Sequence, residues 1–435
     1  MNYRSNRRRF LQNSASIGLG VWIGGAARTG YGRSPNDKLN LGIIGVASRG
    51  AANLEGVKSE NIVALCDVDE KNLAMAAEKY PSAAKLTDWR KLLDRKDIDA
   101  VVVSTTDHTH AVISVRAMRA GKHVYCEKPI ALSVEEARLL RQTALQTKLA
   151  TQQGTQVHAT SNFHKTAKMI QEGGIGPVRE AHVWCTRDGA GWDRPTGDYT
   201  VPPNLHWDLW LGPAPERPYH PDYFPGCAKW NKYWDFGGGV LGDMGSHLID
   251  FPFTALNLNS PTTIEAEGSA LSNETYPKWL RVRWDHPADG GRPPVKVFWY
   301  DGIQRPKAPK EVNTNDWHGI LYVGDKGMLW ANYGGYALLP AEDPKTFKPP
   351  MPNVPPPAEM QGHHDEWIAA CKTGSTTGAN FDYASRLIEH NMLGNLAFRT
   401  GKKITWDAGS AKALGCPEAE RYIRRTYRKG WELQS

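Results

Sequence analysis

Residues 39–50 constrain the fold more than any other part of this 435-residue chain. They begin with an apolar run, Leu39 to Gly45, whose length and flanks are typical of a buried parallel strand. The following turn is a G-x-G-x-x-G pattern with alanine in the middle. Its glycines permit a tight turn and close packing, and its small middle residue lets the backbone approach a pyrophosphate. The sequence therefore predicts a dinucleotide-binding turn formed by Gly45, Ala47, Ser48, Arg49 and Gly50.

Strands and helices alternate after this turn. Short apolar runs predict strands at 62–66, 99–104 and 123–126, and amphipathic stretches predict helices at 49–58, 70–79 and 110–120. A further helix follows Ser133, and Glu136, three residues on, completes a capping-box pattern. Strands separated by helices of roughly 10–15 residues predict a parallel, doubly wound α/β sheet over residues 34–157.

An acidic residue closes the second predicted strand. Asp67 lies 22 residues after Gly45, where a carboxylate would accept the ribose hydroxyls of NAD and repel the extra phosphate of NADP. The alternative is that Asp67 caps the next helix, a role that Asp69 could equally fill. The pattern favours NAD as the cofactor over NADP.

A lysine follows the strand at 123–126, in Glu127-Lys128-Pro129. Ligands of such sheets bind at this edge, so we expect Lys128 to be partly desolvated and its charged form disfavoured, with Glu127 as its local partner. Such a lysine suits proton transfer or the binding of an alkoxide. The alternative is a surface Lys-Pro turn.

Two further polar residues are spaced for one helix face. Asp243 and His247 are four positions apart, and three glycines, 237–239, let the preceding chain turn sharply. The unperturbed pKa of histidine lies close to neutrality, as a base for an alcohol requires. The alternative is a capping Asp243 and a buried structural His247.

These motifs together resemble the glucose–fructose oxidoreductase / inositol dehydrogenase family, often labelled Gfo/Idh/MocA. The resemblance is carried by residues 44–50, 105–110, 120–129 and 234–250. It implies an N-terminal Rossmann domain and a C-terminal α/β domain, predicted at 158–410, with an open, mostly antiparallel sheet. It also implies a dimer or tetramer.

The resemblance assigns roles to single residues. Lys128 would contact the nicotinamide ribose and the substrate, Asp243 would bind the substrate, and His247 would be the general base. Thr105, His110 and Glu127 would lie at the cofactor. The chain departs from the family at Thr106, where proline is frequent, and at His158, where arginine is common. Reading His108 and His110 as a metal pair is an alternative, but we predict no metal.

The second half of the chain is rich in tryptophan. Six of these residues fall between 184 and 234, and their flat faces suit sugar rings, or else they stiffen loops or bury an oligomer interface. Strands are predicted at 262–268, 279–284, 295–300 and 319–323, and helices at 362–371 and 383–398. His363 and His364 either face the site or begin a solvated helix. Residues 411–435 form the predicted tail.

The first 33 residues are predicted to be an export signal. Arg7-Arg8-Arg9-Phe10-Leu11 precedes a mildly apolar run, residues 14–27, that is too short to span a bilayer. We expect a twin-arginine signal and a periplasmic protein; an ordinary amphipathic or disordered N-terminus is the alternative. This segment holds six of the 53 basic residues and no acid, which leaves 47 bases against 46 acids. Such a balance argues against a nucleic-acid partner.

The six cysteines form no C-x-x-C pair. Export after folding in the cytoplasm predicts small, buried or partly buried, reduced thiols. We expect an NAD(P)-dependent oxidoreductase acting on a hydroxyl of a sugar, polyol or glycoside, with its cofactor tightly bound. The alternatives are redox-assisted glycoside hydrolysis and a non-catalytic sugar sensor; the sensor would be expected to lack Lys128 or His247.

Overall fold

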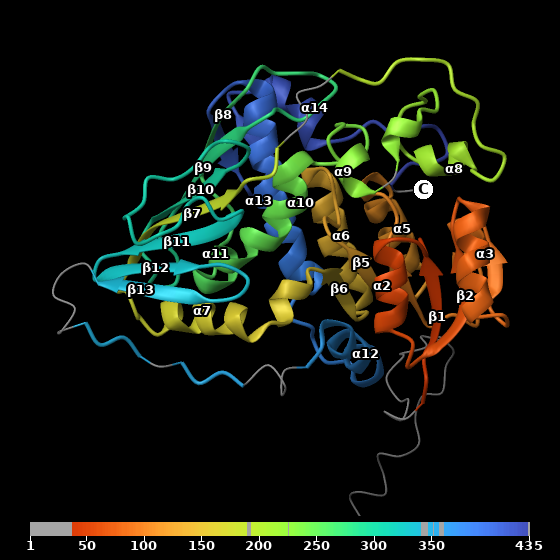
Figure 1. Cartoon of the computed structure of the whole chain (residues 1–435), viewed down its shortest axis with the longest axis horizontal. Coiled ribbons are helices and arrows are strands. Elements are labelled where there is room, and N and C mark those ends of the chain that lie inside the picture. The colour runs from red at the N-terminus through yellow and green to blue at the C-terminus, as the bar shows by residue number, and fades with distance from the viewer. Residues whose placement is uncertain are drawn as a thin grey trace, which may run out of the picture.

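The computed structural model describes residues 37–188, 193–224, 226–340, 347–350, 352–355 and 361–433. The predicted export signal, residues 1–33, lies outside this part of the chain. Two sheets form the framework, with helices between them (Figure 1). In the described part of the chain no helix combines the length and the apolar character needed to cross a bilayer.

The first sheet is parallel, as the sequence predicted, and has six strands in the order β3-β2-β1-β4-β5-β6. The side chains of β4 are buried along its whole length, which explains its uninterrupted apolar sequence. Two short strands, β3 and β6, were not predicted. The strands are β1 (Asn40–Ile44), β2 (Asn61–Cys66), β3 (Ala84–Leu86), β4 (Ala100–Val103), β5 (His123–Glu127) and β6 (Thr151–Gly154).

Five helices connect these strands: α2 (Arg49–Gly56), α3 (Glu70–Lys79), α4 (Trp89–Leu93), α5 (Asp107–Arg119) and α6 (Val134–Thr147). Ser133 caps α6 by accepting from the Glu136 backbone N–H at 3.2 Å, as predicted. The Glu136 carboxylate accepts from Leu132 N at 2.7 Å, one residue before the position that a capping box uses.

The second sheet has nine strands in the order β13-β12-β11-β7-β10-β9-β8-β14-β15. Only β7 and β10 pair in parallel, so the sheet is mostly antiparallel, as the family resemblance implied. The strands are β7 (Val178–Cys185), β8 (Thr263–Gly268), β9 (Leu280–His286), β10 (Val295–Tyr300), β11 (His318–Gly324), β12 (Gly327–Ala331), β13 (Tyr336–Pro340), β14 (Ile404–Asp407) and β15 (Lys412–Leu414).

The remaining helices cover one face of this sheet or join it to the first domain (Figure 1). They are α7 (Ser161–Gln171), α8 (Trp207–Leu211), α9 (Cys227–Trp230), α10 (Gly239–Leu248), α11 (Asp250–Ala255), α12 (His363–Thr373), α13 (Phe381–Thr400) and α14 (Glu420–Ile423). Single 3₁₀ turns are η1 (Gln156–Ala159), η2 (Pro221–Tyr223) and η4 (Pro417–Ala419).

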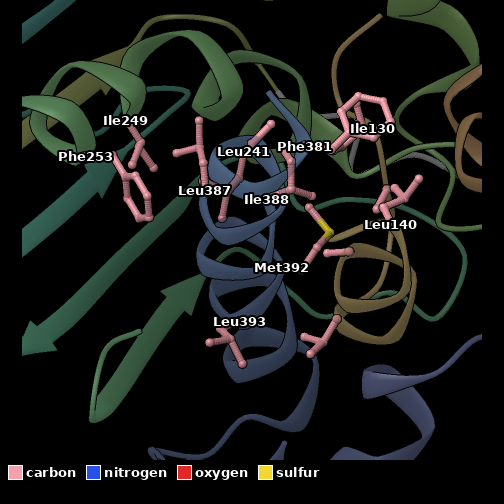
Figure 2. Close-up of a cluster of buried hydrophobic side chains, with 14 of the residues drawn as sticks. Ile130, Leu140, Leu241, Ile249, Phe253, Phe381, Leu387, Ile388, Met392 and Leu393 are labelled. Carbon is pink, nitrogen blue, oxygen red and sulfur yellow. The ribbon is translucent and has the colours of Figure 1, made fainter. Parts of the chain in front are cut away.

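Helix α13 forms the centre of the core between the two domains. Figure 2 shows its Leu387, Ile388, Met392 and Leu393 among apolar side chains from α6, α10 and α11. A bidentate ion pair from Arg138 to Glu389, at 2.6 and 2.9 Å, joins α6 to α13 at the edge of this core. Because one helix packs against both domains, α10 is held at a fixed place relative to the first sheet.

Two late segments return to the first domain. Trp367, Ile368 and Cys371 of α12 share a core with β1 and Tyr125 of β5. Near the end of the chain, the Trp431 ring lies 6.2 Å from the Trp89 ring. The predicted segments 158–410 and 411–435 therefore both contribute contacts to the nucleotide-binding domain.

Candidate active site

A cavity of about 570 Å³ lies at the carboxyl ends of the parallel strands, between the two domains. The turns after β1, β2, β4 and β5 line it on one side, and residues 205–230 and His247 line it on the other. Predicted cofactor residues in the lining are Gly45, Ala47, Ser48, Arg49, Asp67, Thr105, His110, Glu127 and Lys128.

The turn after β1 requires its two glycines. Gly45 has φ +84°, and a Cβ there would lie 2.5 Å from the Ser104 carbonyl oxygen. A Cβ on Gly50 would lie 2.1 Å from the Gly45 carbonyl oxygen. Gly50 is not in the lining, so it shapes the turn by close packing. The turn leaves the N-terminus of α2 facing the cavity, where backbone N–H groups favour an anion.

Asp67 joins the end of β2 to this turn. Its carboxylate accepts from Val46 N and from Asp69 N, both at 3.0 Å, and burial raises its pKa. Asp69 is the residue that caps α3, through a bond from Lys71 N at 2.9 Å. The capping alternative for Asp67 is therefore wrong, and its carboxylate remains at the cavity wall.

Glu127 is not the partner of Lys128, contrary to our expectation. Its Oε1 accepts from Arg49 Nε at 3.0 Å, from Asn53 Nδ2 at 2.9 Å and from Gln156 Nε2 at 3.0 Å. These bonds fix the first turns of α2 against the end of β5. Glu127 thus stabilises the dinucleotide-binding turn through its hydrogen bonds to α2.

His110 bridges two backbone segments beside the cavity. Its Nδ1 lies 2.8 Å from Pro129 O and its Nε2 lies 3.0 Å from Thr105 O. His108 instead lies against Trp210 O, at 3.0 Å. The two imidazoles do not share a ligand position, and the described residues contain no cluster of three or more metal-ligating side chains.

Lys128 and His247 line the cavity, and Asp243, which is buried behind the lining, pairs with Lys128. The Lys128 ammonium pairs with Asp243 Oδ1, and Arg187 Nη1 donates to Asp243 Oδ2 at 2.9 Å. Burial disfavours the lysine charge, yet the Asp243 and Asp107 carboxylates together outweigh it and raise the Lys128 pKa, so our expectation of a disfavoured charge was wrong. Burial likewise opposes the Asp243 charge, but Lys128 lowers the Asp243 pKa.

His247 is held as a neutral imidazole. Burial, followed by the Lys128 charge, lowers its pKa to about 3. Its Nδ1 is buried and has no partner among the described residues, while the residue itself lines the cavity. The neutral ring leaves a nitrogen free to accept a proton, but a pKa this far below neutrality makes it a weaker base than the near-neutral histidine that the sequence led us to expect.

The glycines before α10 set the position of Asp243 and His247. Gly239 has φ +64°, and a Cβ on it would lie 1.9 Å from the Tyr276 ring. The Tyr276 hydroxyl accepts from Leu241 N at 3.2 Å and donates to Asp301 at 2.6 Å. The cap of α10 is Gly238, which removes the capping alternative for Asp243.

Three residues of the site were not predicted. Asp107, the first residue of α5, lines the cavity, and burial raises its pKa well above the usual range. Asp107 follows a buried strand, at the edge of the sheet where ligands bind, and this position could have predicted it. Cys227 also lines the cavity, and Arg187 enters from the end of β7. Nothing in the local sequence of these two residues indicates the site.

Other candidate residues lie elsewhere. His158 Nδ1 pairs with Asp250 Oδ2 at 2.9 Å, away from the cavity lining. His363 is buried and its Nε2 lies 2.8 Å from Gln153 O, so a solvated helix start is wrong. His364 stacks on the Tyr125 ring at 4.8 Å. All six cysteines are free, as predicted, although Cys227 is exposed rather than buried.

The tryptophans are divided between the cavity and the core. Trp210 and Trp230 line the cavity, whereas Trp184 is buried in the second domain. Trp207 stacks on Trp210 with ring centroids 4.7 Å apart. Trp192 lies outside the described residues.

Family models decide the classification of the chain. Residues 39–155 match the oxidoreductase family with an NAD-binding Rossmann fold, and residues 195–433 match the C-terminal alpha/beta domain of that oxidoreductase family. The chain belongs to the Gfo/Idh/MocA oxidoreductase family. Its first domain is a NAD-binding domain.

Two curated relatives are similar to part of the chain. A glycosyl hydrolase family 109 protein of Saccharopolyspora erythraea is 31% identical over 40% of this chain and 45% of the relative. A levoglucosan dehydrogenase of Pseudarthrobacter phenanthrenivorans is 26% identical over 43% of this chain and 40% of the relative. The chain thus matches less than half the length of either relative.

A solved structure extends the likeness in fold. The WlbA dehydrogenase of Chromobacterium violaceum, in complex with NADH and UDP-GlcNAcA, has a TM-score of 0.61 and 18% identity. The match covers 86% of this chain and 97% of that structure. At this identity, the likeness supports the two-domain fold.

Proposed function

We propose that this protein is an NAD(P)-dependent oxidoreductase that transfers a hydride between a hydroxyl of a sugar, polyol or glycoside and a tightly held nicotinamide cofactor. The observation that carries the proposal is that Lys128, paired with Asp243, and His247 line one cavity together with the dinucleotide-binding turn. The relative named levoglucosan dehydrogenase supports a carbohydrate substrate.

The residues of the first domain fit the cofactor. The turn at Gly45 to Gly50 has no space for side chains at its two glycines, and it places the N-terminus of α2 where a pyrophosphate would bind. Asp67 would bind the adenosine ribose hydroxyls and disfavour a 2′-phosphate, which favours NAD over NADP. When bound, the cofactor supplies the hydride acceptor.

Residues of both domains act on the substrate oxygen. His247 takes the hydroxyl proton at the nitrogen facing the cavity, since its Nδ1 is buried. Lys128 donates a hydrogen bond to the same oxygen as negative charge develops on it, and Asp243 holds the lysine in place. Fixing the alcohol between these groups lowers the entropic cost of reaching the reactive geometry.

A panel of sugars and polyols, followed by nicotinamide absorbance, tests this function. Wild type should reduce NAD with at least one member, and Lys128→Ala and His247→Ala should each lower kcat/KM by about 10²- to 10⁴-fold. Lys229→Ala, which changes an exposed lysine of α9, is the matched control and should retain activity. Equal activity of His247→Ala and wild type would contradict the assignment.

Redox-assisted glycoside hydrolysis is the second candidate. It is favoured by one observation, the 31% identity to a glycosyl hydrolase family 109 protein. Release of free sugar from aryl glycosides without added NAD would establish it. A dehydrogenase should instead release no free sugar from the aryl glycoside and should oxidise a hydroxyl while its NAD is reduced.

Export with a bound cofactor is part of the proposal. The twin-arginine pattern at Arg7-Arg8-Arg9 is typical of a pathway that transports folded proteins, and soluble NAD is scarce outside the cytoplasm. We therefore expect an enzyme that recycles its NAD by oxidising one substrate and reducing another. Denatured protein from the periplasmic fraction should release a nicotinamide nucleotide. Its absence would count against retention.

A cofactor strap, residues 202–230, supports retention. It runs from the second domain across the first and lines the cavity with Leu205, Leu209 and Trp210. Asn204 and His206 attach it to the start of α3, through bonds to Asp69 at 2.7 Å and Glu70 at 2.8 Å. Backbone bonds from Glu70 N to Asn204 O and from His206 N to Val68 O, both at 2.9 Å, reinforce the attachment.

Loosening the strap should release the cofactor faster. The double variant Asn204→Ala with His206→Ala removes two bonds of about 0.5–1.5 kcal/mol each, so we expect a rise in the NAD dissociation rate of about fivefold to a hundredfold. Stopped-flow fluorescence with excess competitor measures this rate. Lys412→Ala, which changes an exposed lysine of β15 outside the strap, is the control, and an unchanged NAD dissociation rate in the double variant would show that the strap does not retain the cofactor.

A further inference from the structure

The turn between β12 and β13, residues 332–335, carries a tyrosine to the back of the active site. Asn332 Oδ1 accepts from Gly334 N and from Gly335 N, each at 2.9 Å. Asn162 Nδ2 donates to Asn332 O at 2.7 Å and to Gly335 O at 3.2 Å. Tyr333 N donates to His318 Nε2 at 3.1 Å. The tyrosine therefore has a fixed position.

The Tyr333 ring packs against the helix that carries the proposed base. Its centroid lies 6.4 Å from that of His247, with the ring planes at 70°, and 6.5 Å from that of Phe251. The Tyr333 hydroxyl is buried without a hydrogen-bond partner among the described residues, and so is His247 Nδ1. Leaving two buried polar groups of adjoining rings unpaired costs free energy, so such groups require an explanation.

Burial keeps the Tyr333 phenol protonated. It raises the pKa of the phenol, Cys185 and the Asp243 carboxylate raise it further, Arg187 opposes them, and Asp250 adds a smaller contribution that raises it. Asp243 lies four residues before His247 and Asp250 three residues after it, on one face of consecutive helical turns. The phenol therefore stays neutral, with its oxygen available as an acceptor.

Other acceptors near His247 are already engaged. Asp243 pairs with Lys128 and Arg187, and Asp250 accepts from Tyr383 and pairs with His158. A histidine that accepts a proton at Nε2 must carry its own proton at Nδ1, and the acceptor for Nδ1–H fixes this tautomer. Among the described groups packed against this ring, the Tyr333 hydroxyl is the one without a partner.

We propose that Tyr333 is a positioning residue for His247. Its phenolic oxygen accepts Nδ1–H of His247 through one bridging water, and so leaves Nε2 free to take the substrate proton. This inference rests on the proposed role of His247 as the base. Tyr333 itself touches neither substrate nor cofactor.

The test replaces the hydroxyl alone, in Tyr333→Phe, with Tyr336→Phe on the same hairpin as the control. Nitrogen-15 NMR of the histidines in the NAD-loaded, full-length protein identifies the tautomer, and His247→Ala assigns the signal. We expect the Nδ1–H tautomer in wild type and in Tyr336→Phe, and a shift toward Nε2–H in Tyr333→Phe. An Nε2–H tautomer in wild type, or an unchanged tautomer in Tyr333→Phe, would overturn the proposal.

Steady-state kinetics on a substrate from the panel supply a second measurement. Tyr333→Phe should lower kcat about tenfold or more with KM changed less than twofold, because only the base is affected. A rise in KM at constant kcat would instead make Tyr333 a substrate contact and overturn the positioning role. The NMR measurement needs no turnover. If no member of the substrate panel reacts, that result counts against the proposed function, and the effect of Tyr333→Phe on the His247 tautomer still tests the role of Tyr333.

Discussion

At the scale of single residues, burial and pairing fix the protonation states of the site. Lys128 and Asp243 remain charged because each stabilises the other, while His247 stays neutral because it is buried beside a cation. The free ring nitrogen of His247 is then the proton acceptor of the site, and the ammonium of Lys128 is the donor for a developing alkoxide.

Asp67 supplies the first prediction at this scale. Asp67→Ala removes the acceptor of Val46 N and the expected ribose contact, so NAD affinity should fall by about 1–3 kcal/mol, roughly five- to a hundredfold. NADP binding should fall less, because the carboxylate no longer repels its phosphate. Fluorescence titration with both cofactors measures this, with Asp97→Ala, an exposed carboxylate, as control. An equal loss of affinity for NAD and NADP would show that Asp67 only stabilises the turn and does not select between the two cofactors.

The His158–Asp250 pair predicts a pH dependence of stability. Burial opposes the imidazolium, but Asp250 outweighs it and raises the His158 pKa above its usual value of about 6.5. The stabilisation is therefore complete below about pH 6.5 and is lost as the pH rises through the raised pKa. Urea unfolding should show that the difference in unfolding free energy between wild type and His158→Gln becomes smaller from pH 6 toward pH 9.

His364→Gln is the control for this titration. Burial lowers the His364 pKa to about 4, whereas the unfolded chain binds a proton there near pH 6.5, so the difference in unfolding free energy between wild type and His364→Gln should change in favour of wild type as the pH rises from 6 toward 7, opposite in sign to that for His158→Gln. If the difference in unfolding free energy between wild type and His158→Gln does not depend on pH, the His158–Asp250 pair is not ionised in the folded protein.

At the scale of elements, the position of α10 depends on its entry. The three glycines bring the helix against Tyr276, whose hydroxyl connects the first turn of the helix to Asp301 at the end of β10. The second sheet therefore determines where Asp243 and His247 lie relative to Lys128.

Gly239→Ala should disturb this entry. The new Cβ would fall 1.9 Å from the Tyr276 ring, at a φ of +64° that alanine disfavours. We expect a loss of about 2–4 kcal/mol in unfolding free energy, measured in urea. Gly334→Ala, whose Cβ would meet only Asn332 Oδ1 at 3.7 Å, is the matched control and should be nearly neutral.

At the scale of the whole molecule, the second sheet has one face covered by helices and another that carries half-buried apolar side chains. Residues 295, 297 and 299 of β10 point into the common core, whereas Phe298 points the other way, and its ring stacks on His182 at 4.7 Å. Val323, Met328 and Trp330 belong to the same apolar cluster. Apolar area of this kind is typical of an interface.

We expect this face to form the dimer or tetramer contact that the family resemblance implied. Phe298→Glu would place a charge in that contact and should shift the protein to monomer in light-scattering chromatography. Leu145→Glu, which changes an exposed leucine of α6, should leave the oligomer unchanged. A monomeric wild type would contradict the expectation.

The local sequence was sufficient to predict those elements whose formation depends on residues close together in the chain. The turn at Gly45 to Gly50 and α3 follow from glycine spacing, periodicity and a stop signal, and both formed as predicted. β7 was not predicted, because Val178–Cys185 mixes charged and apolar residues, and its central place depends on pairing with β10 and β11. β3 is only three residues long and is set by its pairing with β2.

The sequence by itself determined the parallel sheet, the dinucleotide-binding turn and the three residues of the proposed chemistry, because each depends on residues close together in the chain. Only the tertiary structure decided that Lys128 pairs with Asp243 rather than Glu127, and that Arg187 and Tyr333 reach the same helix face. Those contacts join residues 56 to 115 positions apart in the chain, and their free energy depends on burial that no local pattern encodes.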